Sequence, residues 1–277
     1  MKFRKSINLI LMLLLCVAAA AQEKKSTALA NVTVLEKTFE IPDLNRSRKV
    51  RVYLPPGYEN GRGKYPVLYM HDAQNLFDDA TSFVGEWGVD ENLNELSEST
   101  GLDLIVVGID NGQENRNTEL TPWENERLGK PEGEAYMRFV VEVVKPYIDS
   151  RYRTKAGRKH TAVMGSSLGG LISHYAIYTY PRVFGKAGIF SPSYWVSEEV
   201  YAYTKNNPLP KDSRLYLLVG QKEGPMMYEQ MDKMYAFIKE QGHPAVNISA
   251  KTNPEGAHNE KFWRSEFMEA IKWLFEK

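Results

Sequence analysis

Residues 159–170 read Lys-His-Thr-Ala-Val-Met-Gly-Ser-Ser-Leu-Gly-Gly, and the organisation of the chain can be worked out from them. The apolar run before Gly165 predicts a buried strand, and residues 168–180 predict a helix. A strand that turns into a helix around Gly-x-Ser-x-Gly is the pattern of a nucleophile elbow, in which the serine backbone is strained and its hydroxyl is exposed. Gly165 and Gly169 supply the small residues that such a crowded turn needs. Ser167 is therefore the candidate nucleophile.

A simpler interpretation of the same residues is a glycine-rich turn in which two serines cap a helix. A dinucleotide-binding loop is excluded, because the sequence lacks Gly-x-Gly-x-x-Gly. The strand before the motif and the helix after it favour the elbow.

The composition is that of an ordinary globular protein, with 277 residues, 43% of them hydrophobic and 25% charged. The formal net charge is zero, so the chain has no basic field for nucleic acid, and we expect no nucleic-acid partner. No linker-like run divides the chain. We therefore predict a single α/β domain over residues 22–277.

The first 21 residues have the features of a secretory signal peptide. A basic start precedes an apolar run at 9–21, which is shorter than the roughly 20 residues needed to span a bilayer. Small residues at its end predict cleavage between Ala21 and Gln22, and hence a periplasmic or secreted protein without a membrane span. The basic residues are Lys2, Arg4 and Lys5.

Cys16 offers an alternative, a lipoprotein anchored through this residue, although Leu15 before it is bulkier than a lipobox usually has. It is also the only cysteine of the chain. A cleaved chain would have none, which excludes disulfides, thiolate catalysis and cysteine metal sites.

Strands that alternate with helices predict a mainly parallel sheet with helices on both faces, and two alternating N-terminal segments predict antiparallel strands at its start. The polar segment 115–130 predicts an irregular excursion, and Pro146 predicts a kink or an end in its helix. The other predicted strands are 32–40, 49–54, 66–70, 104–109, 186–190, 215–219 and 246–250, and the other helices are 89–97, 134–148, 226–239 and 260–275.

A serine hydroxyl becomes a good nucleophile only when a base removes its proton. In an α/β-hydrolase the acid and then the histidine follow the serine, each on a loop after a strand. Of the five histidines, only His258 lies on such a loop, after the last strand and in the right order. The others fit less well: His160 and His243 at the opposite sheet edge, His71 out of order, and His174 two turns along the helix after Ser167.

Glu223 is the candidate acid, because it comes just after the strand 215–219 and would fix the tautomer of the histidine. Asp212 precedes that strand and Asp232 lies inside the following helix. Glu255 stays open as an alternative, or as a solvated loop charge.

Two backbone N–H groups are needed to stabilise an oxyanion. We expect them from Leu168, directly after the serine, and from Ala73, on the loop after strand 66–70. Asp72 is expected to brace that loop by bonding to backbone. The adjacent His71 and Asp72 suggest a metal site, but no His-Glu-x-x-His or other ligand cluster accompanies them, so no metal is expected.

Several side chains near this edge are candidate substrate contacts. Trp123, Tyr194 and Trp195 would stack a sugar or an aromatic acyl group, with Gln74 close to the oxyanion loop, and Trp87 is a further candidate. Packing under loops is the alternative for each aromatic residue. Trp263 and Trp273 are expected in the core.

The chain resembles the putative esterase family of α/β-hydrolases, which includes enterochelin esterases, feruloyl and acetyl-xylan esterases, formylglutathione hydrolases and mycolyltransferases. The segments that carry the resemblance are 65–77 (YPVLYMHDAQNLF), 144–149 (VKPYID), 164–171 (MGSSLGGL), 190–195 (FSPSYW) and 256–258 (GAH).

The resemblance implies a serine hydrolase of ester bonds without a metal or organic cofactor. Ser167 and His258 match the family motifs, Glu223 stands where members differ, and Ala73 stands where many members have glycine. The substrate would be a small-molecule or oligosaccharide ester. Export favours feruloyl or acetyl esters of carbohydrate, or siderophore esters, over cytosolic formylglutathione. An acyltransferase and a non-catalytic ligand-binding protein on the same fold are the alternatives.

Overall fold

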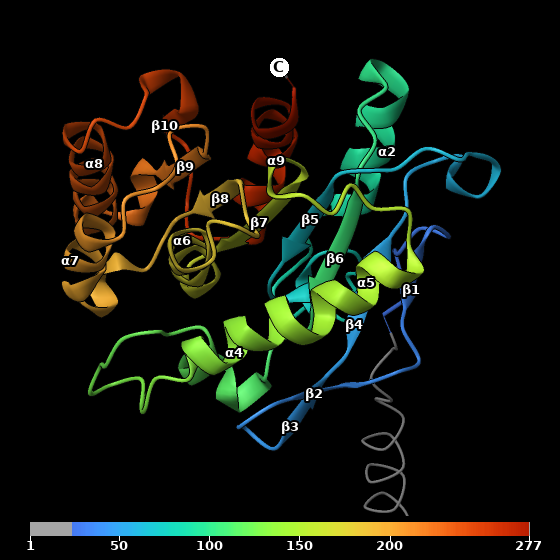
Figure 1. The fold of residues 1–277 in the computed structure, drawn as a ribbon, viewed down its shortest axis with the longest axis horizontal. Helices are drawn as coiled ribbons and strands as arrows, with labels where there is room; N and C mark the ends of the chain where they lie inside the picture. Colours follow the sequence, from blue (N-terminus) through green and yellow to red (C-terminus); the bar gives the residue numbers. More distant parts are fainter. Residues whose placement is uncertain (1–23, 277) are drawn as a thin grey trace, which may run out of the picture.

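The computed structural model describes residues 24–276, and its centre is an eight-stranded sheet in the order β1-β4-β6-β5-β7-β8-β9-β10 (Figure 1). The pairs β1–β4 and β4–β6 are antiparallel, and the pairs from β6 to β10 are parallel. The predicted signal peptide, with Cys16, lies outside the described residues. The strands are β1 (Val32–Val34), β2 (Phe39–Ile41), β3 (Arg46–Arg48), β4 (Val50–Tyr53), β5 (Val67–Met70), β6 (Ile105–Ile109), β7 (Thr161–Ser166), β8 (Lys186–Phe190), β9 (Arg214–Gly220) and β10 (Ile248–Asn253).

Helices cover both faces of this sheet, as the sequence predicts. Alternate residues of each strand point to opposite faces, so Val67 and Tyr69 join one apolar cluster while Leu68 and Met70 join the other. Helices α4 to α8 pack on the first face, and α2 and α9 pack on the second (Figure 1). The helices are α2 (Val89–Thr100), α3 (Arg116–Glu119), α4 (Gly133–Phe139), α5 (Lys145–Arg151), α6 (Leu168–Thr179), α7 (Glu199–Asn206), α8 (Pro225–Glu240) and α9 (Glu260–Phe275).

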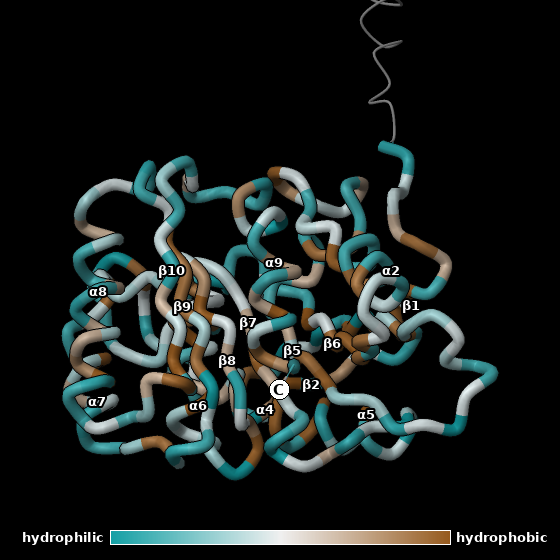
Figure 2. Tube along the Cα trace, turned by 90° about the horizontal axis from the view of Figure 1, so that it is seen from above, coloured by the Kyte–Doolittle hydropathy of each residue, from teal (hydrophilic) through white to brown (hydrophobic). Residues whose placement is uncertain are grey.

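Hydrophobic residues are concentrated in the central strands, and hydrophilic residues predominate in the outlying turns (Figure 2). Strands β5 and β6 are buried along their whole length. These short continuous apolar runs are typical of strands that are covered on both faces. Within residues 24–276, no helix is long and apolar enough to cross a membrane.

The predicted strand 32–40 was wrong as one element. It forms two strands in different sheets, since β1 pairs with β4 and β2 pairs with β3 in a separate hairpin. The polar segment 115–130 contains the short helix α3, and α7 has no counterpart in the prediction.

Pro146 does not end its helix. The helical segment runs from α4 through a π-helical turn, Val140–Val144, into α5, which continues to Arg151. Proline has no N–H for the bond to the residue four positions earlier. The wider π turn directly before Pro146 accommodates that missing bond.

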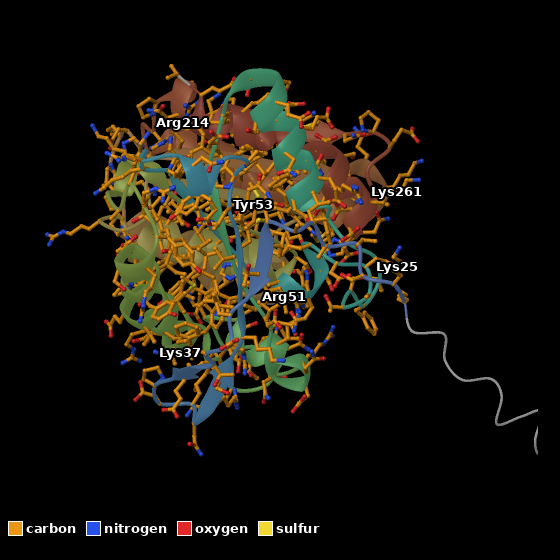
Figure 3. The ribbon with its side chains drawn as sticks, turned by 90° about the vertical axis from the view of Figure 1, so that its right-hand side faces the viewer. Lys25, Lys37, Arg51, Tyr53, Arg214 and Lys261 are labelled. Carbon is orange, nitrogen blue, oxygen red and sulfur yellow. The ribbon has the colours of Figure 1, made fainter. Side chains whose placement is uncertain are left out.

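The carboxyl ends of the parallel strands all lie at one edge of the sheet, and this edge carries the turns after β5, β7, β8, β9 and β10. Arg214 at the start of β9 and Lys261 in the first turn of α9 lie toward opposite sides of the molecule (Figure 3). The parallel register Asn253↔Gly220 brings the turns after β9 and β10 together.

The packing of α6 on β8 leaves no space for a side chain at Gly170, where a Cβ atom would lie 2.6 Å from the Phe190 carbonyl oxygen. We expect Gly170→Ala to lower the free energy of unfolding by about 1–3 kcal/mol, through overpacking, although alanine favours a helix over glycine by about 1 kcal/mol. Urea unfolding measures this. Gly157→Ala is the control, because its φ is −74° and no atom lies within 4 Å of its added Cβ. A Gly170→Ala variant as stable as the control would contradict this packing.

Candidate active site

Ser167 has the strained backbone of an elbow. It joins β7 directly to α6 with φ 59° and ψ −122°, a region that costs a non-glycine residue about 1–3 kcal/mol. Two backbone bonds hold it there: its N–H donates to Phe190 O at 3.0 Å, and its carbonyl accepts from Ser193 N–H at 3.1 Å. A Cβ atom on Gly165 would lie 2.8 Å from the carbonyl of Gly169. The elbow geometry predicted from the sequence is therefore present.

His258 and Glu223 form a hydrogen-bonded pair at the same edge. Nδ1 of His258, on the loop between β10 and α9, lies 2.7 Å from Oε2 of Glu223, on the turn after β9. The Glu223 side chain has no exposed surface, and the His258 side chain is 40% exposed. Because an ionised carboxylate only accepts hydrogen bonds, Nδ1 of His258 carries a proton. The lone pair of Nε2 is then free to act as a base.

The alternative acids lie elsewhere. Asp212 pairs with Arg158 at the opposite edge, and Asp232 is exposed on α8. Glu255 pairs with Lys222 at the surface, with 81% of its side chain exposed.

Ser167 Oγ lies 3.3 Å from Ser193 Oγ. Among the described residues, no hydrogen bond joins Ser167 to His258. Trp263 links His258 to the turn after β8. Its ring lies edge-on to the His258 ring, with centroids 5.0 Å apart, and its indole N–H donates to Ser191 Oγ at 2.9 Å. Catalytic hydrogen bonds are often long in unliganded enzymes and shorten in the substrate complex.

The loop after β5 lies beside the start of α6. Strands β5 and β7 are adjacent, with Met70 opposite Met164, so Ala73 and Ser167 each lie three residues beyond a paired position. Ala73 begins a 3-10 turn and Leu168 begins α6. The first N–H groups of such elements have no acceptor within the element, so both are free to bind an oxyanion.

The Asp72 carboxylate is bound by side chains, and not by the backbone groups expected from the sequence. Its carboxylate accepts from Arg116 at 2.6 and 2.9 Å and from Asn111 at 2.7 Å. Burial opposes its ionisation, but the charge and hydrogen bonds of Arg116 outweigh burial and lower the pKa of Asp72. The Gln74 amide is engaged as well, since its Oε1 accepts from Asn111 N–H at 2.9 Å. Arg116 was missed in the sequence because it lies in the segment expected to be irregular.

Two buried histidines, His71 and His174, are hydrogen-bonded to other side chains. His71 is bonded to the Tyr136 hydroxyl at 2.8 Å, and burial lowers its pKa to about 4. His174 is bonded to Thr204 and Tyr194, and burial lowers its pKa to about 3. Within residues 24–276, no group of three His, Cys, Asp or Glu side chains is arranged to hold a metal ion.

A cleft of about 510 Å³ opens next to the elbow, within the usual size range of ligand pockets. Ser167 and His258 are not among its lining residues, but Ser166, next to Ser167 in sequence, and Trp263, which contacts His258, are. Its apolar wall contains Phe83, Val84, Trp87 and Trp263, and its polar wall contains Asp72, Gln74, Asn111, Arg116 and Glu260.

The aromatic residues differ from the prediction. Tyr194 is 1% exposed and bonded to His174, and Trp123 is 7% exposed and packs against Tyr175, so both belong to the core rather than to the cleft. Trp195 is 39% exposed. Trp263 lies in the core as expected, with 5% of its surface exposed, and it also lines the cleft. Phe83 lines the cleft as well; it is 90% exposed on the loop before α2, and no sequence pattern indicated it.

Comparisons with known proteins give a consistent result. The family model described as putative esterase matches residues 41–274. The uncharacterized protein YbbA of Bacillus subtilis (strain 168) is 27% identical over 83% of this chain and 94% of its own length. The endo-1,4-beta-xylanase/feruloyl esterase of Xylanibacter ruminicola is 24% identical over 88% of this chain and 31% of its own length. The enterobactin esterase FES of Shigella flexneri superposes with a TM-score of 0.73 at 19% identity, over 90% of this chain and 60% of its own.

The ion pair of Asp72 and Arg116 generates a prediction of stability. Arg116→Met leaves a carboxylate whose side chain is only 12% exposed without its cation, and we expect a loss of about 2 kcal/mol at neutral pH, less than for a fully buried pair. Because the folded state lowers the pKa of Asp72, its contribution is present above the ordinary carboxyl pKa and is lost as the pH falls through the lowered value. The difference between variant and wild type should therefore shrink as the pH falls below the ordinary carboxyl pKa.

Urea unfolding at several pH values measures this difference. Arg264→Met is the matched control, since Arg264 reaches its acidic partners only at 3.7 and 4.0 Å with 42% of its side chain exposed. Equal losses in the two variants, or a loss that does not depend on pH, would contradict the bracing role.

Proposed function

The chain belongs to the putative esterase family, and we propose that it is a serine carboxylic-ester hydrolase that works through an acyl-enzyme. The observation that carries the proposal is the backbone of Ser167, whose φ of 59° is retained at the junction of β7 and α6 by two hydrogen bonds. Strain of this kind is found where a side chain must be presented in one geometry. A serine that only capped the helix would not need this strained backbone conformation.

In the proposed mechanism, Ser167 Oγ attacks the acyl carbon of the ester while Nε2 of His258 takes its proton. The backbone N–H groups of Leu168 and Ala73 stabilise the oxyanion of the tetrahedral intermediate. His258 then gives its proton to the leaving alcohol oxygen. Water attacks the acyl-enzyme in the same way, releasing the acid and restoring the serine. Glu223 stabilises the imidazolium at both steps.

We propose an acylated carbohydrate, carrying feruloyl or acetyl esters, as the substrate. Trp87, Trp263 and Phe83 give the cleft flat apolar surfaces on which an aromatic acyl group or a sugar ring packs. Of the three loop residues expected for this role, Tyr194 and Trp123 are buried. The support therefore comes from the cleft aromatics and from the relative named endo-1,4-beta-xylanase/feruloyl esterase.

A siderophore ester is the second candidate, favoured by the fold of the enterobactin esterase. The charge of the cleft argues against it. Arg116 is the cation of the cleft wall, and its guanidinium is bound by Asp72. A ferric catecholate complex is an anion, and this wall offers it no uncompensated positive charge.

We further propose that residues 22–277 form one catalytic domain, exported after removal of the signal peptide at 1–21. The basic start and the short apolar run of that segment support this proposal.

Ser167→Ala should abolish hydrolysis of p-nitrophenyl acetate, lowering kcat by about 10⁴-fold or more, because it removes the proposed nucleophile. A fluorophosphonate probe should label the wild type on the peptide that contains Ser167, as mapped by mass spectrometry, and should not label the variant. Retained turnover in Ser167→Ala, or a label on another serine, would remove Ser167 from the mechanism.

A substrate panel tests the choice of ester. We expect kcat/KM for methyl ferulate or acetylated xylan to exceed that for a ferric catecholate siderophore by about 10-fold or more, because aromatic residues line the cleft and its cation, Arg116, is already paired with Asp72. Liquid chromatography of the products, with and without an added acceptor sugar, separates hydrolysis from acyl transfer. Preference for the siderophore would overturn the substrate, and a new sugar ester would overturn the hydrolase.

A further inference from the structure

The turn Ser191–Ser193, directly after β8, contacts two members of the proposed triad. Ser191 Oγ donates to Glu223 Oε1 at 2.7 Å, and Ser193 Oγ lies 3.3 Å from Ser167 Oγ. Both serines are buried, with 0% and 1% of their surface exposed. This turn belongs to a segment that carries the family resemblance, Phe190–Trp195, but no role in the reaction has so far been assigned to it.

The direction of the hydrogen bonds at Ser191 is fixed by its neighbours. The indole N–H of Trp263 can only donate, so Ser191 Oγ accepts from it at 2.9 Å. The hydroxyl proton of Ser191 is then left for Glu223, which as a carboxylate can only accept. Trp263 thus orients the hydroxyl, and the hydroxyl orients the acid.

Glu223 receives three hydrogen bonds in all. Oε1 accepts from Ser191 and from the N–H of Gly220, each at 2.7 Å, and this leaves Oε2 facing His258 Nδ1. Three donors in different directions fix the plane of the carboxylate. The bond from Ser191 is the one among these three that comes from a side chain outside the acid's own turn and outside the triad.

The backbone of Ser191 is held as firmly as its side chain. Its φ of 44° lies in the left-handed region, which non-glycine residues rarely adopt. Its N–H donates to Leu218 O at 2.7 Å, which fastens the turn to the adjacent strand β9. Strain retained next to a polar contact of this kind indicates a functional constraint rather than packing alone.

We propose that Ser191 is a positioning residue of the esterase: held by Trp263, its hydroxyl fixes the Glu223 carboxylate so that Oε2 meets His258. This inference rests on the proposed function, because Ser191 acts through Glu223 and makes no contact with the reacting atoms.

Ser191→Ala should lower kcat for p-nitrophenyl acetate about 10- to 100-fold, the usual effect of a hydrogen bond to a charged group, and should leave KM within about twofold. In a Glu223→Ala background the same substitution should have less than about a twofold effect, because there is no longer a carboxylate to orient. Ser191→Gly should behave like Ser191→Ala in activity. Glycine tolerates positive φ, so this variant removes the hydroxyl without adding backbone strain.

Ser213→Ala is the matched control, because Ser213 is equally buried and its hydroxyl accepts from Arg158 at the opposite edge of the sheet. It should cost similar stability in thermal unfolding and leave kcat unchanged. Full activity of Ser191→Ala, an undiminished loss in the Glu223→Ala background, or an equal loss in Ser213→Ala would overturn the positioning role. Activity that survives Ser167→Ala would instead overturn the proposed function, so the two failures are distinguishable.

Discussion

The turn from β7 into α6 is too tight for side chains, and the arrangement of the candidate site depends on this constraint. Gly165 and Gly169 approach each other so closely that a Cβ atom on the former would lie 2.8 Å from the latter. Ser167 takes the strained conformation between them, and two backbone bonds to the turn after β8 stabilise it. The Ser167 carbonyl also accepts from Leu171 N–H at 3.0 Å, so the neighbouring strand and the helix of the elbow stabilise the strained residue together. Because β8 must lie beside β7 for the bonds to Phe190 and Ser193 to form, the geometry of the serine depends on the order of the parallel strands.

Two buried carboxylates at this edge are stabilised in different ways. The positive charge of Arg116 neutralises the carboxylate of Asp72. The role of this ion pair is to hold the loop that carries Ala73. Glu223 receives hydrogen bonds from Ser191 and Gly220 on one oxygen, and its other oxygen faces Nδ1 of His258. Hydrogen bonds from neutral groups make the buried charge tolerable without cancelling it. A negative charge thus remains available to stabilise an imidazolium, which is the state that the proposed mechanism forms twice.

The sequence allows the sheet and the triad candidates to be predicted for a physical reason. Strands buried on both faces are continuous apolar runs, and the residues after them converge on one edge whatever the loops do, so Ser167, Glu223 and His258 follow from order alone. The pairing of the N-terminal strands cannot be predicted in this way. β1 and β2 are short and alternate apolar with polar residues, so the sequence does not reveal that β1 pairs with β4 and β2 with β3. Burial of individual aromatic residues also escapes it. Tyr194 and Trp195 are neighbours in sequence, yet one is bonded to His174 in the core and the other is 39% exposed.

The candidate catalytic groups and the proposed substrate contacts consequently lie in different kinds of segment. The candidate catalytic groups sit on short turns whose backbone is fixed by strand pairing, by positive φ at Ser167 and Ser191, and by hydrogen bonds between adjacent turns. The outer walls of the cleft come from Phe83 on the exposed loop before α2 and from Arg116 in the polar segment after β6. Neither region has a period or a packing requirement that its sequence would reveal. Arg116 serves both the cleft wall and the catalytic edge, because it lines the cleft and its pair with Asp72 holds the loop that carries Ala73. Under the proposed function, a change at Phe83 would therefore alter the choice of ester without disturbing the elbow, whereas a change at Arg116 would disturb the oxyanion loop as well.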